Sequence, residues 1–167
     1  MFGGTVNLKY CAVQWNDDDA FDWDQGYKGK GQFWFAVKSS TRGDNGFEMD
    51  SDDNHCLQLP NSHPIVYNAT VIGDDTDAGL EAKENTEGEI YNSIIANYQQ
   101  GLNIYNLLSP DVYNNWNANN FKVQNCTFTS NLTSFTIQTA TINPAAGADL
   151  TKFTTDANVE AASIPGF

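Results

Sequence analysis

Eight carboxylate side chains occur in a pattern that could do chemistry. Five of them alternate with apolar residues in three short segments, and three form a run just before the first segment. The alternating residues are Asp22, Asp24, Glu48, Asp50 and Glu81, and the run is Asp17, Asp18 and Asp19. Neighbouring residues of a β-strand point to opposite faces. If the segments are strands, the alternating carboxylates therefore share one face, which we expect to be exposed to solvent.

Carboxylates gathered in this way favour a divalent cation. Like charges directly opposed on a sheet are destabilising, and calcium takes oxygen ligands in a flexible geometry that a carboxylate-rich turn provides. We therefore predict a calcium site formed by Asp17, Asp18, Asp19, Asp22, Asp24, Glu48 and Asp50. The alternative is a solvated acidic face that mainly keeps the protein soluble. The segment Asp50–Asn54 has no distal glutamate, so an EF-hand loop is excluded.

Catalysis is a further interpretation of the same carboxylates. Glycosidases use two carboxyl groups as general acid and base, and polysaccharide lyases need a basic group that abstracts a proton. Acidic groups are plentiful, but the chain has a single arginine, Arg42, in an expected loop. His55 and His63 flank another expected loop and are candidate bases, metal ligands or ligand-binding residues. Two histidines in such a loop are more often ordinary loop residues.

Aromatic side chains form a candidate surface for carbohydrate. Tyr113 and Trp116 lie in an asparagine-rich segment. Flat rings beside amide groups suit sugars, which have apolar ring faces and polar rims. We therefore predict that both residues bind ligand. The alternative is that the aromatic residues only cover the flank of the fold.

A short phrase that the chain repeats five times would position these residues. Each copy reads small, apolar, polar, apolar, and its first apolar residues are Phe21, Phe47, Leu80, Leu102 and Phe135. The copies are about 22 to 33 residues apart, which indicates a solenoid whose repeat is one coil of short strands. Equivalent residues of successive coils lie above one another. The five apolar residues are therefore predicted to form one interior stack.

A second phrase precedes the first one in each repeat. Asn68, Asn92 and Asn125 occupy the same place in the last three copies, and Tyr10 and Trp34 take that place in the first two. Asparagine tolerates the left-handed backbone conformation. A bend between two strands is therefore predicted at this position.

Together the two phrases resemble those of the right-handed parallel β-helix, the pectate-lyase-like fold, and within it the bacterial surface β-helix repeat proteins. The segment Asn16–Gly29 resembles a motif of that surface group. The resemblance covers about residues 5–140 and implies an all-β parallel β-helix solenoid of about five coils. It implies little about activity, because members of the surface group mostly have no assigned activity.

Two longer repeats contain extra residues, around 51–63 and 106–119. Both insertions follow the third strand of a coil, so both loops are predicted to leave the solenoid on the same side, two coils apart. After residue 142 the phrase is lost and the chain is rich in alanine, threonine and glycine. We therefore expect a β-helix over residues 1–142 and a C-terminal cap or extended tail over residues 143–167.

The charge balance excludes some partners. The chain has 8 basic and 21 acidic residues, a formal charge of −13, which repels phosphate backbones. Nucleic acid is therefore not an expected partner. No apolar segment approaches the roughly 20 residues of a transmembrane helix, so no membrane span is expected.

These patterns favour an extracellular or cell-surface β-helix that is structural or adhesive rather than catalytic, and that binds calcium and polysaccharide. The alternative is a polysaccharide lyase or glycoside hydrolase that acts on an acidic polysaccharide. A first strand near Thr5 leaves few residues to cap the first coil, although the ends of a solenoid need a cover. We therefore also expect a longer polypeptide or self-association through the open solenoid ends.

Overall fold

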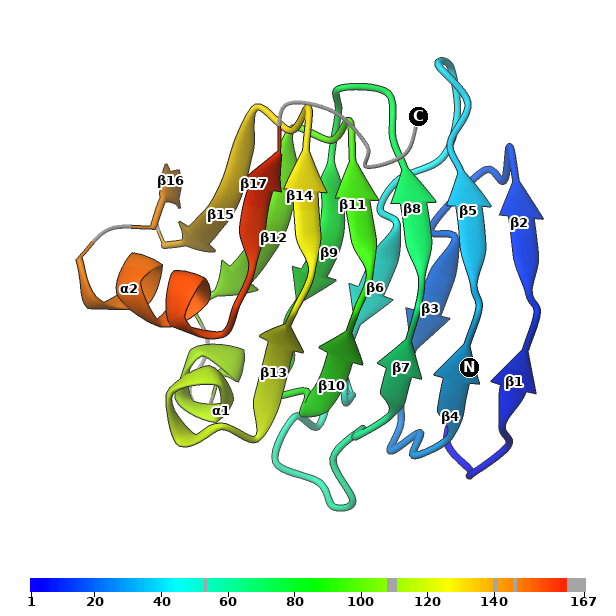
Figure 1. The fold of residues 1–167 in the computed structure, drawn as a ribbon. Coiled ribbons are helices and arrows are strands. Elements are labelled where there is room, and N and C mark those ends of the chain that lie inside the picture. Colours follow the sequence, from blue (N-terminus) through cyan, green and yellow to red (C-terminus); the bar gives the residue numbers. More distant parts are fainter. Residues whose placement is uncertain (53, 108–110, 140, 146, 162–167) are drawn as a thin grey trace.

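The computed structural model describes residues 1–52, 54–107, 111–139, 141–145 and 147–161. Five successive coils, each of three short strands, stack along one axis (Figure 1). The strands that occupy the same place in successive coils pair in parallel and form three sheets. The fold is therefore the all-β parallel solenoid predicted from the repeats.

Each sheet takes one strand from every coil. Sheet 1 contains β1 (Leu8–Lys9), β4 (Lys30–Gln32), β7 (Ile65–Tyr67), β10 (Gly88–Tyr91) and β13 (Phe121–Gln124). Sheet 2 contains β2 (Ala12–Gln14), β5 (Phe35–Val37), β8 (Thr70–Ile72), β11 (Ile94–Ala96), β14 (Thr127–Thr129) and β17 (Val159–Ala161). Sheet 3 contains β3 (Phe21–Trp23), β6 (Phe47–Met49), β9 (Ala78–Ala82), β12 (Gln100–Tyr105), β15 (Thr133–Gln138) and β16 (Ile142–Pro144), of which only β16 is antiparallel to its neighbour.

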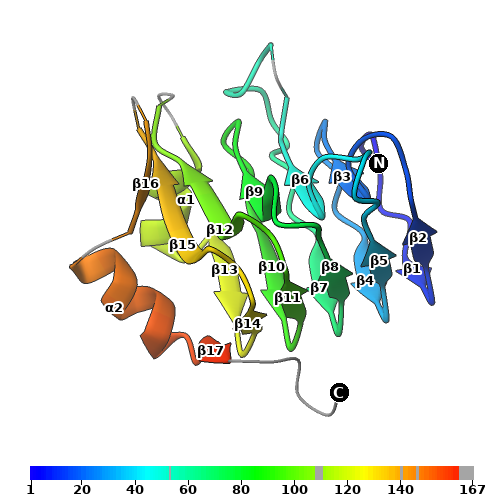
Figure 2. The same ribbon diagram turned by 90° about the horizontal axis from the view of Figure 1, so that it is seen from above.

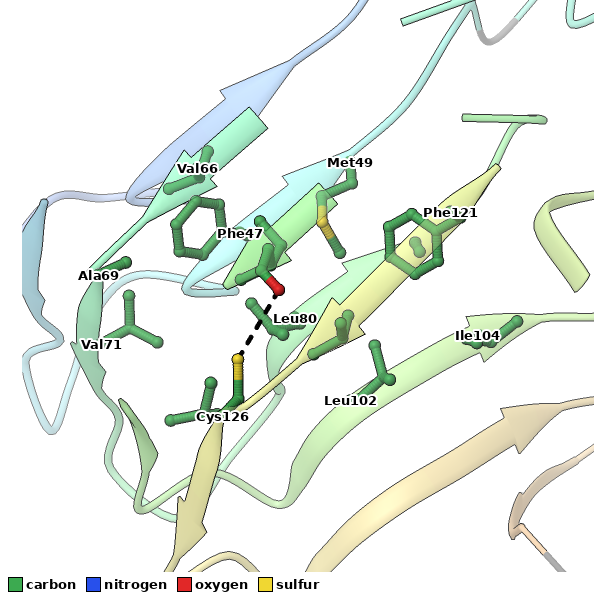
Figure 3. Close-up of a cluster of buried hydrophobic side chains, with 14 of the residues drawn as sticks. Phe47, Met49, Val66, Ala69, Val71, Leu80, Leu102, Ile104, Phe121 and Cys126 are labelled. Atoms are coloured by element: carbon green, nitrogen blue, oxygen red, sulfur yellow. Dashed lines mark hydrogen bonds between the residues drawn. The ribbon is translucent and has the colours of Figure 1, made fainter. Parts of the chain in front are cut away.

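The predicted interior stack is present in sheet 3. Its members lie in register from coil to coil and are almost fully buried: Phe21, Phe47, Leu80, Leu102 and Phe135. Figure 3 shows Phe47, Leu80 and Leu102 among apolar side chains from the other two sheets. The Sγ atom of Cys126 points into this interior, 3.9 Å from the Ile90 carbonyl oxygen. All three cysteines are unpaired.

In three of the five phrases the small residue is a glycine, and it is required for a steric reason. A Cβ atom at Gly79 would lie 2.2 Å from Ile95 Cγ2, and one at Gly101 would lie 2.5 Å from Phe128 Cδ1. Each of these contacts is far inside van der Waals distance. In these coils the chain turns into sheet 3 too close to its neighbours for a side chain to fit, whereas the first and fifth coils accept Ala20 and Ser134 at the same position.

The bend between sheets 1 and 2 has the predicted backbone conformation. Asn68, Asn92 and Asn125 have φ values of 59°, 51° and 56°. In the first two coils Tyr10 and Phe33 adopt the same conformation, at 59° and 58°. The prediction of Trp34 at this position was wrong by one residue, because the Trp34 side chain is 1% exposed and packs inside the coil.

Both insertions leave from strands of sheet 3, as predicted. These strands, β6 and β12, are two coils apart, and β9 lies between them. The first leads from β6 to β7, and the second contains α1 (Val112–Ala118) between β12 and β13. Asn85, in the loop after β9, connects them. Its Nδ2 donates to the Cys56 carbonyl at 2.8 Å, and its Oδ1 accepts from Asn115 Nδ2 at 3.1 Å.

The two ends of the solenoid differ (Figures 1 and 2). At the C-terminal end, α2 (Ala148–Thr155) covers the last coil, where Phe153 packs on Phe128 and Phe135 at centroid distances of 5.0 Å. At the N-terminal end, β1 and β2 are the outermost strands of their sheets. The first residues pair with the chain at the end of β3, through a bridge between Phe2 and Asp24.

Candidate acidic site on sheet 3

A ladder of three carboxylates crosses the outer face of sheet 3. Asp22 of β3 lies beside Glu48 of β6, and Glu48 lies beside Glu81 of β9. The predicted register is therefore confirmed. Adjacent strands are about 4.8 Å apart, so these side chains meet at close range. Burial raises the pKa of Asp22 and of Glu81.

The ladder ends at the fourth coil in uncharged groups. Asn103 is next to Glu81 in the register and donates from Nδ2 to Glu81 Oε2 at 3.2 Å. Thr136 follows in the fifth coil and donates to Asn103 Oδ1 at 3.0 Å. The acidic part of sheet 3 is thus confined to the first three coils.

Asp24 and Asp50 do not face solvent, although the alternation predicted that they would. Their residues are only 9% and 4% exposed. The N-terminal segment covers this row, where Gly3 N donates to the Asp24 carbonyl at 2.9 Å. The first insertion also folds over it, and Gln25 N donates to the Ser51 carbonyl at 2.6 Å. The alternation placed Asp24 and Asp50 on the correct face of sheet 3, but the segments that cover this face were not predicted.

A second acidic group lies in the turns that lead into sheet 3. Asp18, Asp19 and Asp44 each offer a carboxylate oxygen, and these oxygens lie within 4.8 Å of one another. Calcium binds oxygen at about 2.3–2.6 Å, so two ligands on opposite sides of one ion are about 4.6–5.2 Å apart. The three oxygens can therefore reach one calcium ion.

Asp44 was missed by the sequence analysis. It lies three residues before Phe47, as Asp18 lies three residues before Phe21 and Asp77 three residues before Leu80. The fixed offset from the interior stack could have found it. The register of the coils then places Asp18 beside Asp44, where Asp44 N donates to the Asp18 carbonyl at 3.2 Å.

Asp19 links the turns to the ladder. Its carboxyl group is hydrogen-bonded to that of Glu48, and it also accepts from Asn45 N at 2.7 Å. Burial, together with the hydrogen bond and the negative charge of Glu48, raises the pKa of Asp19 to about 7. The turn group and the ladder thus form one acidic patch, composed of Asp18, Asp19, Asp22, Asp44, Glu48 and Glu81.

Lys83 supplies a positive charge at one edge of this patch. Its Nζ lies 2.6 Å from Glu48 Oε1 and 3.6 Å from Asp50 Oδ2. Burial alone would lower the pKa of Lys83, but the hydrogen bond to Glu48 and the charge of Asp50 outweigh burial and raise it. Lys83 therefore stays protonated and is unsuited to abstract a proton.

The neighbouring turns hold further ion pairs. Lys38 Nζ lies 3.2 Å from Asp74 Oδ1 and also contacts Asp77. Asp17 is exposed and pairs with Arg42 at 2.8 Å, and it is not part of the group of close carboxylate oxygens. Among the described residues, no basic side chain forms an ion pair with Asp18, Asp19 or Asp44.

The two histidines contact neither the residues of the acidic patch nor a common partner. His55 is exposed in the first insertion, with Nδ1 3.5 Å from Asp52 Oδ1. His63 lies at the start of the next coil between two glutamates, with Nδ1 2.8 Å from Glu87 Oε2 and Nε2 3.4 Å from Glu89 Oε1. They therefore do not form one site.

The predicted ligand-binding aromatics belong to α1. Trp116 is fully buried against Phe121 and Phe135, and Lys152 Nζ lies 4.5 Å from its ring centroid. Trp116 therefore has no ring face free for a sugar. Tyr113 is half-buried and donates to Asp149 Oδ1 at 2.8 Å. For Trp116 the alternative interpretation, a cover on the solenoid flank, is the right one.

The fold and the comparisons agree on the class of protein. Stacked parallel coils with three sheets define a parallel β-helix. Residues 1–166 match the family model of the pectate-lyase-like beta helix domain, and the chain belongs to this family. No curated protein and no solved structure matches the chain significantly. Neither of the two described helices is long and apolar enough to cross a membrane.

Proposed function

We propose that the protein is a non-catalytic extracellular or cell-surface β-helix that binds calcium at the acidic patch and, through the ion, acidic polysaccharide. The observation that carries this proposal is the group formed by Asp18, Asp19 and Asp44, whose oxygens are spaced for one calcium ion. Membership of the pectate-lyase-like family supports polysaccharide as the partner and an extracellular location.

The energetics of the patch support the presence of a cation. Like charges on neighbouring strands destabilise a sheet, and Lys83 is already paired with Glu48 and Asp50. A divalent ion would neutralise the turn carboxylates and remove the need for a proton at Asp19. It would also leave coordination positions open to the carboxylate of an acidic sugar.

Calorimetric titration and thermal unfolding at about pH 8 test calcium binding. An ion that binds only the folded state raises the unfolding midpoint by mass action, so millimolar calcium should raise it relative to chelator. Asp19→Asn and Asp44→Asn should abolish the increase. Glu160→Gln, which removes an exposed charge on β17, should retain it. An equal midpoint in calcium and in chelator would refute the calcium site.

A second candidate is hydrolysis of a glycosidic bond, and one observation favours it. The carboxyl group of Asp19 has a pKa raised to about 7, so at neutral pH it can donate a proton as a general acid. Asp19 would be the acid, and the second carboxylate would be another member of the acidic patch, because the two carboxyl groups of a glycosidase lie about 5 Å or more apart, whereas Glu48 is in contact with Asp19. A lyase is less well supported, because Lys83 is held protonated by its partners.

New reducing ends from neutral or acidic polysaccharides would distinguish the two candidates. A binding protein produces none at any calcium concentration. A hydrolase would produce them, and Asp19→Asn would stop their formation while Glu160→Gln would not.

We also propose that the protein self-associates through its N-terminal end. β1 and β2 are edge strands, and unpaired strand edges template further pairing. Val6, Tyr10 and Trp15 are 60%, 72% and 69% exposed there. The cap formed by α2 and β16 makes head-to-tail stacking unfavourable, so pairing of two N-terminal ends is the expected form.

A further inference from the structure

The outer face of sheet 1 has a composition unlike that of sheet 3. Its side chains lie in two rows that run across the strands. One row contains Lys9, Gln32, Tyr67, Tyr91 and Gln124. The other contains Lys30, Ile65, Glu89 and Lys122. Apart from Ile65 and Glu89, these residues are lysines, amides and tyrosines, and they take the place that carboxylates take in the first coils of sheet 3.

A groove lies over the N-terminal part of this face. It has a volume of about 340 Å³ and is lined by Asn7, Leu8, Lys9, Lys30, Gly31, Gln32 and Tyr67. This volume is within the range of small-molecule sites, about 300–1,000 Å³. The groove is open to solvent, as expected for a site that binds part of a chain.

The lysines of the groove are free of carboxylate partners. Five basic residues form ion pairs: Lys38, Arg42, Lys83, Lys122 and Lys152. The other three, Lys9, Lys28 and Lys30, are exposed and make no ion pair with any described residue. Lys9 and Lys30 line the groove. Lys9 Nζ also lies 5.0 Å from the ring centroid of Tyr10 and 5.4 Å from that of Phe33. The groove is therefore a local region of positive charge in a chain whose formal charge is −13.

Tyr67 forms the aromatic wall of the groove. Tyr91 stacks on it from the next coil, at a centroid distance of 4.9 Å and an interplanar angle of 20°. The groove lies on the opposite side, toward β4 and β1, so the ring face away from Tyr91 borders it. Asn7 Oδ1 accepts from Lys30 N at 2.8 Å, which fixes the amide with its NH₂ group free to donate.

We propose that this groove binds an anionic carbohydrate, with Lys9 and Lys30 pairing with a carboxylate or sulfate ester and Tyr67 packing on the sugar ring. Each group has a matching part on such a ligand: ammonium for the anion, the tyrosine ring for the apolar sugar face, and amides for hydroxyl groups. A neutral sugar would leave the lysines unused. The site is separate from the acidic patch and needs no calcium.

Binding in the presence of a chelator tests the proposal and keeps it distinct from the proposed function. The probes are dextran sulfate, polygalacturonate and uncharged dextran, measured with the full chain by calorimetry or affinity electrophoresis. We expect at least one anionic polymer to bind in chelator and dextran to bind more weakly. Comparison of dextran sulfate with polygalacturonate then shows whether the groove prefers a sulfate ester or a carboxylate. Binding that requires calcium and is lost in Asp44→Asn would support the acidic patch alone and overturn the groove.

Variants distinguish binding in the groove from non-specific attraction of an anionic polymer to any exposed lysine. An exposed ion pair contributes up to about a fivefold change in affinity, so the double variant Lys9→Gln/Lys30→Gln should bind on the order of tenfold more weakly. Tyr67→Leu should also weaken binding. Lys28→Gln removes the same charge from an unpaired lysine outside the groove and should bind like the wild type. Equal losses in Lys28→Gln and Lys30→Gln, or binding of dextran as tight as that of dextran sulfate, would overturn the proposal.

Discussion

The carboxyl groups of Asp19 and Glu48 are hydrogen-bonded to each other, one from a turn and the other from the middle of β6. Such a bond requires a proton between two groups that are both ionised in water at neutral pH. The pKa of Asp19 accordingly rises to about 7, through burial and the proximity of Glu48. This contact makes the stability of the β-helix depend on pH.

Thermal unfolding should show that the protein is more stable near pH 5 than near pH 8. The folded state holds a proton on Asp19 that the unfolded chain, with an ordinary pKa of 3.8, releases. The resulting stability is fully present below the unfolded pKa and is lost as the pH rises through about 7. Burial raises the pKa of Asp22, Asp44 and Glu81 too, which acts in the same direction.

Asp19→Asn should reduce this dependence and raise the unfolding midpoint at pH 8, because an amide can hydrogen-bond Glu48 without a shared proton. Glu160→Gln is the matched control and should keep the wild-type slope. A slope in Asp19→Asn equal to that of the wild type would show that other groups cause it.

Leu80→Ala should lower the free energy of unfolding by about 2–5 kcal/mol, the usual range for a leucine in a packed core. Leu80 is fully buried between Phe47 and Leu102 of the neighbouring coils. Leu132→Ala makes the same chemical change at a side chain that is 78% exposed, and its effect should stay within about 0.5 kcal/mol. Denaturant unfolding measures both. Similar losses in the two variants would contradict the interior stack.

Substitutions at Asn92 should report on the bend between sheets 1 and 2. Its φ of 51° is left-handed, a conformation that costs an ordinary L-residue roughly 1–2 kcal/mol and a β-branched residue more. Asn92→Val should therefore destabilise the protein by at least about 1 kcal/mol, whereas Asn92→Gly should be close to neutral. If urea midpoints rank valine above glycine, the backbone of this bend is not what limits the choice of residue.

Light scattering coupled to size exclusion should find particles heavier than one chain at high concentration. Val6→Lys and Trp15→Lys place charges at the open end and should return the protein to a monomer, since edge lysines oppose pairing. Leu132→Lys makes a similar change away from that end and should have no effect. A wild-type monomer at every concentration would refute pairing through β1 and β2.

The repeat was predictable because a solenoid imposes the same demands on every coil. Each coil needs an apolar residue at the Leu80 position and a small one at the Gly79 position, and its bend favours a residue that tolerates a left-handed backbone. Such local requirements recur along the chain and leave a periodic pattern. The five coils, the interior stack and the register of Asp22 with Glu48 follow from that pattern alone.

What covers the coils depended on segments outside the pattern, and only the tertiary structure decided it. The alternation predicted exposure for Asp24 and Asp50, but the N-terminal residues and the first insertion lie over them. Trp116 was a candidate for a sugar-binding surface until α1 folded its ring against Phe135. Burial is a sum over neighbours from the whole chain, whereas periodicity reports only the direction in which a side chain leaves its own strand. The sequence therefore determined which face each residue of the β-helix occupies, and the insertions, cap and N-terminal segment decided which faces meet water.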